Sequence, residues 1–60
     1  MTARPTITET VTTWRDATGR QRQLHEAGYL TMAVDMGETI TVFVWAKPGG
    51  RDLEQLPPKN

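Results

Sequence analysis

Few residues in this sequence could perform acid–base or nucleophilic chemistry. There is no serine and no cysteine, which removes the usual acyl-transfer nucleophiles and the thiolate metal ligands. The one histidine, His25, stands next to Glu26, but neighbouring residues on a strand point to opposite faces and could not act together. A single histidine is also too few for a structural zinc site. We therefore expect a non-enzymatic protein without a metal or cofactor.

One local cluster has the residue types of a binding site. Trp14 is followed by Arg15, Arg20 and Arg22, and on a hairpin these side chains could form a β-ribbon that enters a nucleic-acid groove. The chain as a whole has seven basic and seven acidic residues and no net charge, whereas phosphate binding normally needs a basic excess. The favoured interpretation is a solvated hairpin whose arginines pair with nearby carboxylates, and nucleic-acid binding is the alternative.

The elements that would position these residues are mostly strands. The pattern predicts a mainly β fold, a small antiparallel meander of three to four strands at about 6–15, 20–26, 29–35 and 38–46. Five threonines between positions 6 and 13 favour a strand in the first segment. Asp16 and Gly19 are typical of a hairpin turn, with the glycine in the left-handed position. Alternatively, a short helix at about 17–27, capped by Gly28, would give the order β-α-β-β.

The turn segment WRDATGR, residues 14–20, is similar to the turn of the tyrosine-aspartate hairpin repeats. The resemblance covers about seven residues and does not recur in the chain. It implies a hairpin at this position and has no implication for function.

The last two predicted strands carry apolar residues on both faces. A three-residue loop ending at Gly37 would pair Met32 with Ile40, and register decides which side chains share a face. One face would then hold Leu30, Met32, Val34, Ile40, Val42 and Val44. The other would hold Tyr29, Phe43 and Trp45. Such a sheet needs cover on both sides, either from the tail or, as we favour, from another chain, because aromatic residues are enriched at interfaces.

Length predicts one small domain. We expect a flexible N-terminus at 1–5, a β domain at 6–47 and a polar tail at 48–60 that could dock through Leu53 and Leu56. Domains of this size without disulfides or metals are usually stabilised by association. The longest apolar run is too short for a bilayer and the N-terminus lacks the apolar region of a signal peptide, so we expect a cytoplasmic protein.

Together these patterns predict a small protein-binding module, a homo-oligomeric accessory, inhibitor or regulatory protein whose partner is itself or another protein. The expected contact residues are Tyr29, Phe43, Trp45 and, at a second contact, Trp14. The alternative function is a nucleic-acid-binding β-ribbon dimer that uses Arg15, Arg20 and Arg22.

Overall fold

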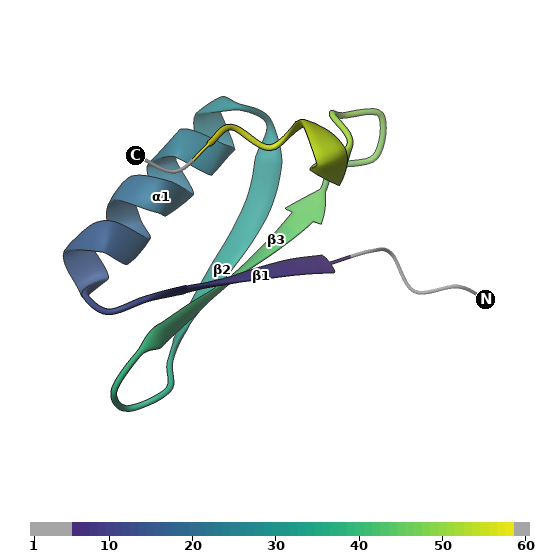
Figure 1. Cartoon of the computed structure of the whole chain (residues 1–60). Helices are drawn as coiled ribbons and strands as arrows, with labels where there is room; N and C mark the ends of the chain where they lie inside the picture. Colours follow the sequence, from purple (N-terminus) through teal and green to yellow (C-terminus); the bar gives the residue numbers. More distant parts are fainter. Residues whose placement is uncertain (1–5, 59–60) are drawn as a thin grey trace.

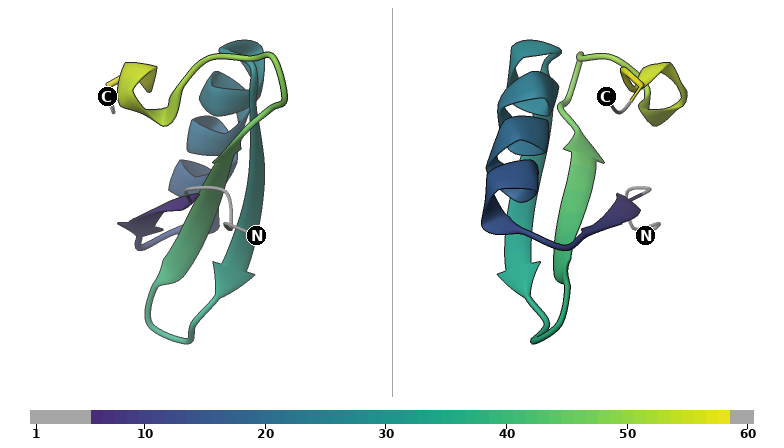
Figure 2. Two further views of the ribbon diagram at one scale, coloured as in Figure 1. Left: turned by 90° about the vertical axis from the view of Figure 1, so that its right-hand side faces the viewer. Right: turned by 60° about the vertical axis from the view of Figure 1, so that its left-hand side comes forward.

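The protein folds as a three-stranded antiparallel sheet with one helix on a single face (Figures 1 and 2). The computed structural model describes residues 6–58. Its elements are β1 (Thr6–Val11), α1 (Trp14–Glu26), β2 (Tyr29–Asp35), β3 (Ile40–Ala46) and a short 3-10 helix, η1 (Leu53–Gln55). The spatial order is β1-β3-β2, so that β3 lies in the middle. This element order is that of the β-α-β-β alternative. The predicted strand at 20–26 is wrong, because these residues belong to α1. The segment expected to be flexible, 1–5, lies outside the described residues.

Helix α1 forms because both of its ends are capped. Thr13 has extended backbone, and its Oγ1 accepts a hydrogen bond from the N–H of Asp16 at 3.1 Å. At the other end Gly28 takes a φ of +97° and its N–H donates to the carbonyl of His25. The residues between these caps favour a helix, and the two caps outweigh the strand preference of the preceding threonines.

The predicted hairpin turn at Asp16–Gly19 is therefore wrong. Both residues lie inside α1, and Gly19 is not among the described glycines with positive φ, which are Gly28, Gly37 and Gly49. The first strand ends at Val11 rather than at Arg15. The similarity to the tyrosine-aspartate hairpin turn does not extend to the structure.

The loop between β2 and β3 has four residues, 36–39, instead of the three that we expected. The Oδ1 of Asp35 accepts a hydrogen bond from the N–H of Gly37 at 2.8 Å, and Gly37 has a φ of +101°. The N–H of Met36 donates to the carbonyl of Thr39 at 2.8 Å. These bonds close a turn in which Asp35 is the last residue of β2.

The longer loop changes the register of the hairpin. Met32 pairs with Phe43, whereas the expected partner was Ile40, a shift of three positions (43 minus 40). Because the shift is an odd number, it moves the side chains of β2 to the other face relative to β3. Leu30, Met32 and Val34 consequently share a face with Phe43 and Trp45.

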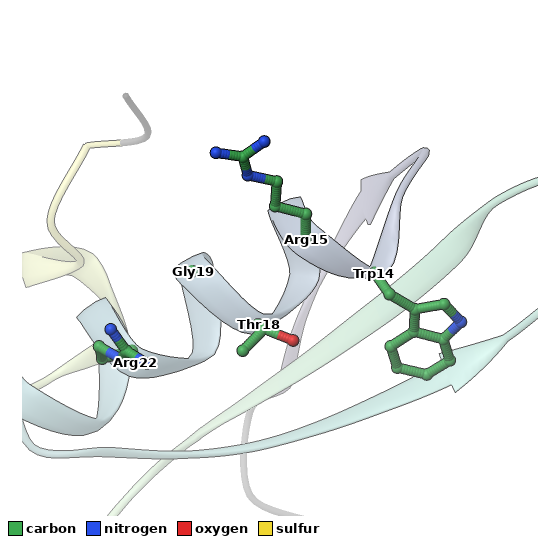
Figure 3. A pocket seen from close by; sticks show the side chains of 5 residues that line it. All are labelled: Trp14, Arg15, Thr18, Gly19 and Arg22. Atoms are coloured by element: carbon green, nitrogen blue, oxygen red, sulfur yellow. The ribbon is translucent and has the colours of Figure 1, made fainter.

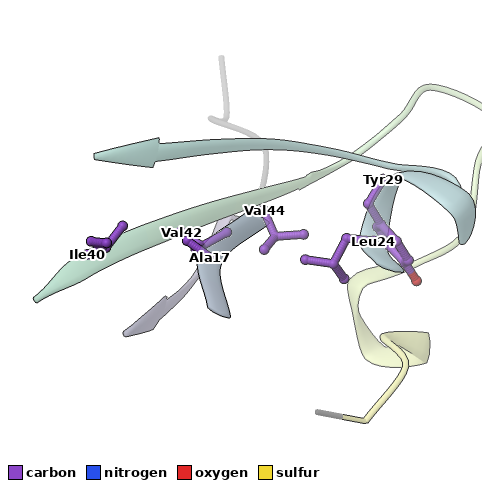
Figure 4. Close-up of a cluster of buried hydrophobic side chains, with 6 residues drawn as sticks. All are labelled: Ala17, Leu24, Tyr29, Ile40, Val42 and Val44. Atoms are coloured by element: carbon purple, nitrogen blue, oxygen red, sulfur yellow. The ribbon is translucent and has the colours of Figure 1, made fainter. Parts of the chain in front are cut away.

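The core lies between α1 and the sheet (Figure 4). Its buried members are Ala17, Leu24, Tyr29, Ile40, Val42 and Val44. Tyr29, which we expected on the aromatic face, is thus fully buried, and its hydroxyl donates to the carbonyl of Asp52 at 2.6 Å. Leu53 and Leu56 of the tail pack against this core, so the tail returns to the helix side of the sheet.

A buried ion pair joins α1 to β1. The guanidinium of Arg20 donates from Nε and Nη2 to the two carboxylate oxygens of Glu9 at 2.7 and 2.8 Å. Its Nη1 donates to Oε1 of Gln23 at 2.8 Å. The side chains of Arg20 and Glu9 are only 7% and 9% exposed. This bidentate geometry fixes the helix on the edge strand.

Candidate protein-binding surface

Among residues 6–58, none of the strand side chains on the face of the sheet opposite to α1 is charged. Strand alternation and register place nine side chains on it in three rows. From one edge to the other the rows are Thr6, Thr8 and Thr10 of β1, then Thr41, Phe43 and Trp45 of β3, then Leu30, Met32 and Val34 of β2. We call this surface the open face.

The apolar part of the open face is accessible. Leu30, Met32 and Val34 are 46%, 55% and 37% exposed, and Phe43 and Trp45 are partly buried. The two aromatic rings stack on each other with centroids 6.1 Å apart and planes inclined by 20°. No segment between Thr6 and Pro58 shields the β2 row, because the tail packs on the opposite side. The result is a small hydrophobic surface with a stacked aromatic pair on its central strand.

The structure separates the four predicted contact residues. Phe43 and Trp45 lie together on the open face. Tyr29 belongs to the core. Trp14 is the first residue of α1 and is 50% exposed on the helix, so it forms part of a different surface.

The sequence interpretation missed the β2 row of the open face. The prediction of a three-residue loop places Leu30, Met32 and Val34 in the core. A signal for the correct loop was present, since Asp35 stands two residues before Gly37. An aspartate in that position commonly accepts a hydrogen bond from the backbone N–H two residues on, which begins a turn at the aspartate.

The three arginines of the alternative prediction are not on one surface. Arg20 points inward to Glu9, whereas Arg15 and Arg22 lie on the exposed side of α1. Together with Trp14, Thr18 and Gly19 they line a shallow hollow of about 510 Å³ (Figure 3). These residues stand on a helix, not on a β-ribbon.

The polar contacts of His25 join the helix to the sheet. Its Nε2 lies 2.7 Å from Oγ1 of Thr31, and the Nε2 of Gln21 donates to the same oxygen at 3.2 Å. In residues 6–58 no three His, Asp or Glu side chains are grouped as metal ligands would be. Within the same range no helix is long and apolar enough to cross a membrane.

No family model matches the sequence, and no curated protein or solved structure shows significant similarity to it.

Proposed function

We propose that this protein is a small, non-enzymatic protein-binding module that associates with a second copy of itself through the open face. The observation that carries the proposal is the uncovered row of Leu30, Met32 and Val34 beside the Phe43–Trp45 stack. In the remainder of the described chain the apolar residues are largely gathered in one core. Burial of a largely apolar face without charges costs little desolvation free energy, so such a face is well suited to a protein interface.

The chemistry of the open face favours a protein partner. Nucleic-acid surfaces combine aromatic residues with arginine or lysine that neutralise the phosphates, and none of the nine positions is basic. Two copies can associate through this face around a two-fold axis, because in such a dimer each copy contributes the same patch to the interface. Sheets stacked in this way lie about 10 Å apart, which brings the two aromatic rows into contact at the centre.

The area of the open face determines how strong the self-association is expected to be. Three strands about 4.8 Å apart and about 20 Å long cover roughly 300 Å² as a flat rectangle. Two such faces together give about 600 Å² before side-chain relief is included, which is below the roughly 1,200 Å² of a standard stable interface. We therefore expect reversible association at micromolar rather than nanomolar concentrations through this face alone.

The test is analytical ultracentrifugation from low micromolar to high micromolar concentration. The wild-type protein should shift from monomer to dimer as concentration rises. The variant Met32→Lys should weaken the dimer about tenfold or more, because it inserts a charge in the middle of the exposed β2 row, beside Phe43. Gln55→Lys is the matched control, since it adds the same charge at an exposed position of η1.

The expected control result is unchanged association. A wild-type protein that stays monomeric at every concentration would refute the proposal. So would a Met32→Lys variant, shown to be folded by circular dichroism, that associates as strongly as Gln55→Lys.

A further inference from the structure

The hollow on α1 presents two unpaired cations beside an exposed indole (Figure 3). Arg15 and Arg22 form no ion pair with any residue in the described range, and Glu26, one turn after Arg22, is not bonded to it. The two arginines are seven residues apart, which is about 10 Å along the helix axis. Trp14 closes one end of the hollow and is 50% exposed. Such a surface suits a partner that offers carboxylates to the two arginines and an apolar side chain to the indole.

Gly19 is on the wall of this hollow, and the fold does not account for it. Glycine in the middle of a helix is less stable than alanine by about 1 kcal/mol. A methyl group at Gly19 would meet no atom within 4 Å, so nothing in the described structure requires its absence. A missing side chain at this point lets another backbone or side chain approach the helix closely.

The loop between β2 and β3 has the complementary features. Asp35 and Glu38 are exposed acidic residues, and Glu38 forms no ion pair within residues 6–58. Between them Met36 is 63% exposed, the highest value among the large hydrophobic residues described. The loop therefore carries two carboxylates around one flexible apolar side chain.

The loop and the hollow begin at the same end of the molecule. Val11, at the end of β1, pairs with Ile40, at the start of β3, so the entry to α1 lies near the β2–β3 loop (Figure 1). Two molecules related by a two-fold axis at this end can each offer a loop to the helix of the other. Such a reciprocal contact closes on itself and does not continue into a filament.

We propose that the β2–β3 loop of one copy docks into the α1 hollow of a second copy. Met36 contacts the indole of Trp14, and the carboxylates of Asp35 and Glu38 face Arg15 and Arg22. Sulfur–aromatic contact and charge-assisted hydrogen bonds both favour this pairing. The inference depends on self-association, as proposed above, but uses a separate surface on the helix side of the sheet.

Two charge-reversed variants test the contact. In the first, Arg15→Glu and Arg22→Glu make the hollow acidic. In the second, Asp35→Asn and Glu38→Lys make the loop basic and keep the Oδ1 that accepts the N–H of Gly37. Each variant alone repels its own copy at this contact. An equimolar mixture restores attraction in both halves of the contact, because the acidic hollow meets the basic loop and the basic hollow meets the acidic loop.

The expected result by sedimentation is weaker association of each variant alone, by about tenfold or more, and recovery in the mixture. Recovery should disappear near 1 M salt, where the screening length is about 3 Å. The inference would be overturned if each variant alone associated as strongly as the wild type. It would also be overturned if the mixture associated no more strongly than the separate variants.

These outcomes are distinct from failure of the open-face proposal. Met32→Lys leaves the charges of the loop and the hollow unchanged, so it should weaken wild-type association without abolishing recovery in the charge-reversed mixture. Recovery in the mixture, together with a Met32→Lys variant that associates as strongly as the wild type, would support the loop contact and refute association through the open face. Dimerisation that depends on Met32 but shows no recovery would do the reverse.

Discussion

Removal of the guanidinium of Arg20 should be among the most destabilising single changes in this protein. In the variant Arg20→Ala the carboxylate of Glu9, whose side chain is 9% exposed in the wild-type protein, loses its two hydrogen bonds from Nε and Nη2. It also removes the donor to Gln23. Breaking a buried pair by deleting one partner usually costs about 3–5 kcal/mol.

That loss is comparable with the whole stability of the domain. At about 0.05–0.15 kcal/mol per residue, a chain of 60 residues is stable by about 3–9 kcal/mol. We therefore expect Arg20→Ala to be largely unfolded or to unfold at very low denaturant. Urea titration followed by circular dichroism and by the fluorescence of the two tryptophans measures the change.

The double variant Glu9→Leu/Arg20→Met is the control that removes both charges of the ion pair. Replacing both partners with apolar side chains leaves no buried charge, so its stability should lie close to or above that of the wild type. A loss below about 1 kcal/mol in Arg20→Ala would refute the reasoning, because that is the value of a solvent-exposed pair. A double variant as unstable as Arg20→Ala would show that the fold depends on the ion pair itself, and that the cost does not come from the carboxylate left behind by Arg20→Ala.

Two further changes test other parts of the fold. Gly19→Ala should raise the free energy of unfolding by about 0.5–1 kcal/mol in urea titration, because the added methyl group meets no atom within 4 Å. A loss of stability there would show that Gly19 is not helical. Tyr29→Phe should lower stability by about 1 kcal/mol, because it removes the hydrogen bond to the carbonyl of Asp52. It should also speed tryptic cleavage after Arg51, and an unchanged cleavage rate would mean that the tyrosine hydroxyl does not hold the tail.

Local sequence signals determined several elements of the fold. The alternation of Tyr29–Asp35 predicted β2 with the same bounds as in the structure, and the final strand was predicted two residues too long at its start. The favoured prediction for residues 20–26 was a strand, but the alternative helix at about 17–27 ended within one residue of α1, because Gly28 is a typical C-cap residue. These features depend on neighbouring residues, which is why a sequence can reveal them.

The start of α1 was harder to predict because two local preferences compete there. The threonines up to Thr13 favour a strand, yet the same residue is an effective N-cap once its hydroxyl accepts the N–H of Asp16. The buried pair of Arg20 with Glu9, eleven residues away, then anchors the helix on β1. An ion pair between two separate segments leaves no pattern among neighbouring residues from which it could be predicted.

The composition of the open face depended on tertiary structure. The sequence showed that the last hairpin is apolar on both sides, but not which side chains of β2 accompany Phe43. A loop of four residues instead of three reverses that assignment, because the register shifts by an odd number of residues. The folded protein buries Tyr29 beneath the tail and the helix and leaves Leu30, Met32 and Val34 outside, because the helix covers only one face of the sheet.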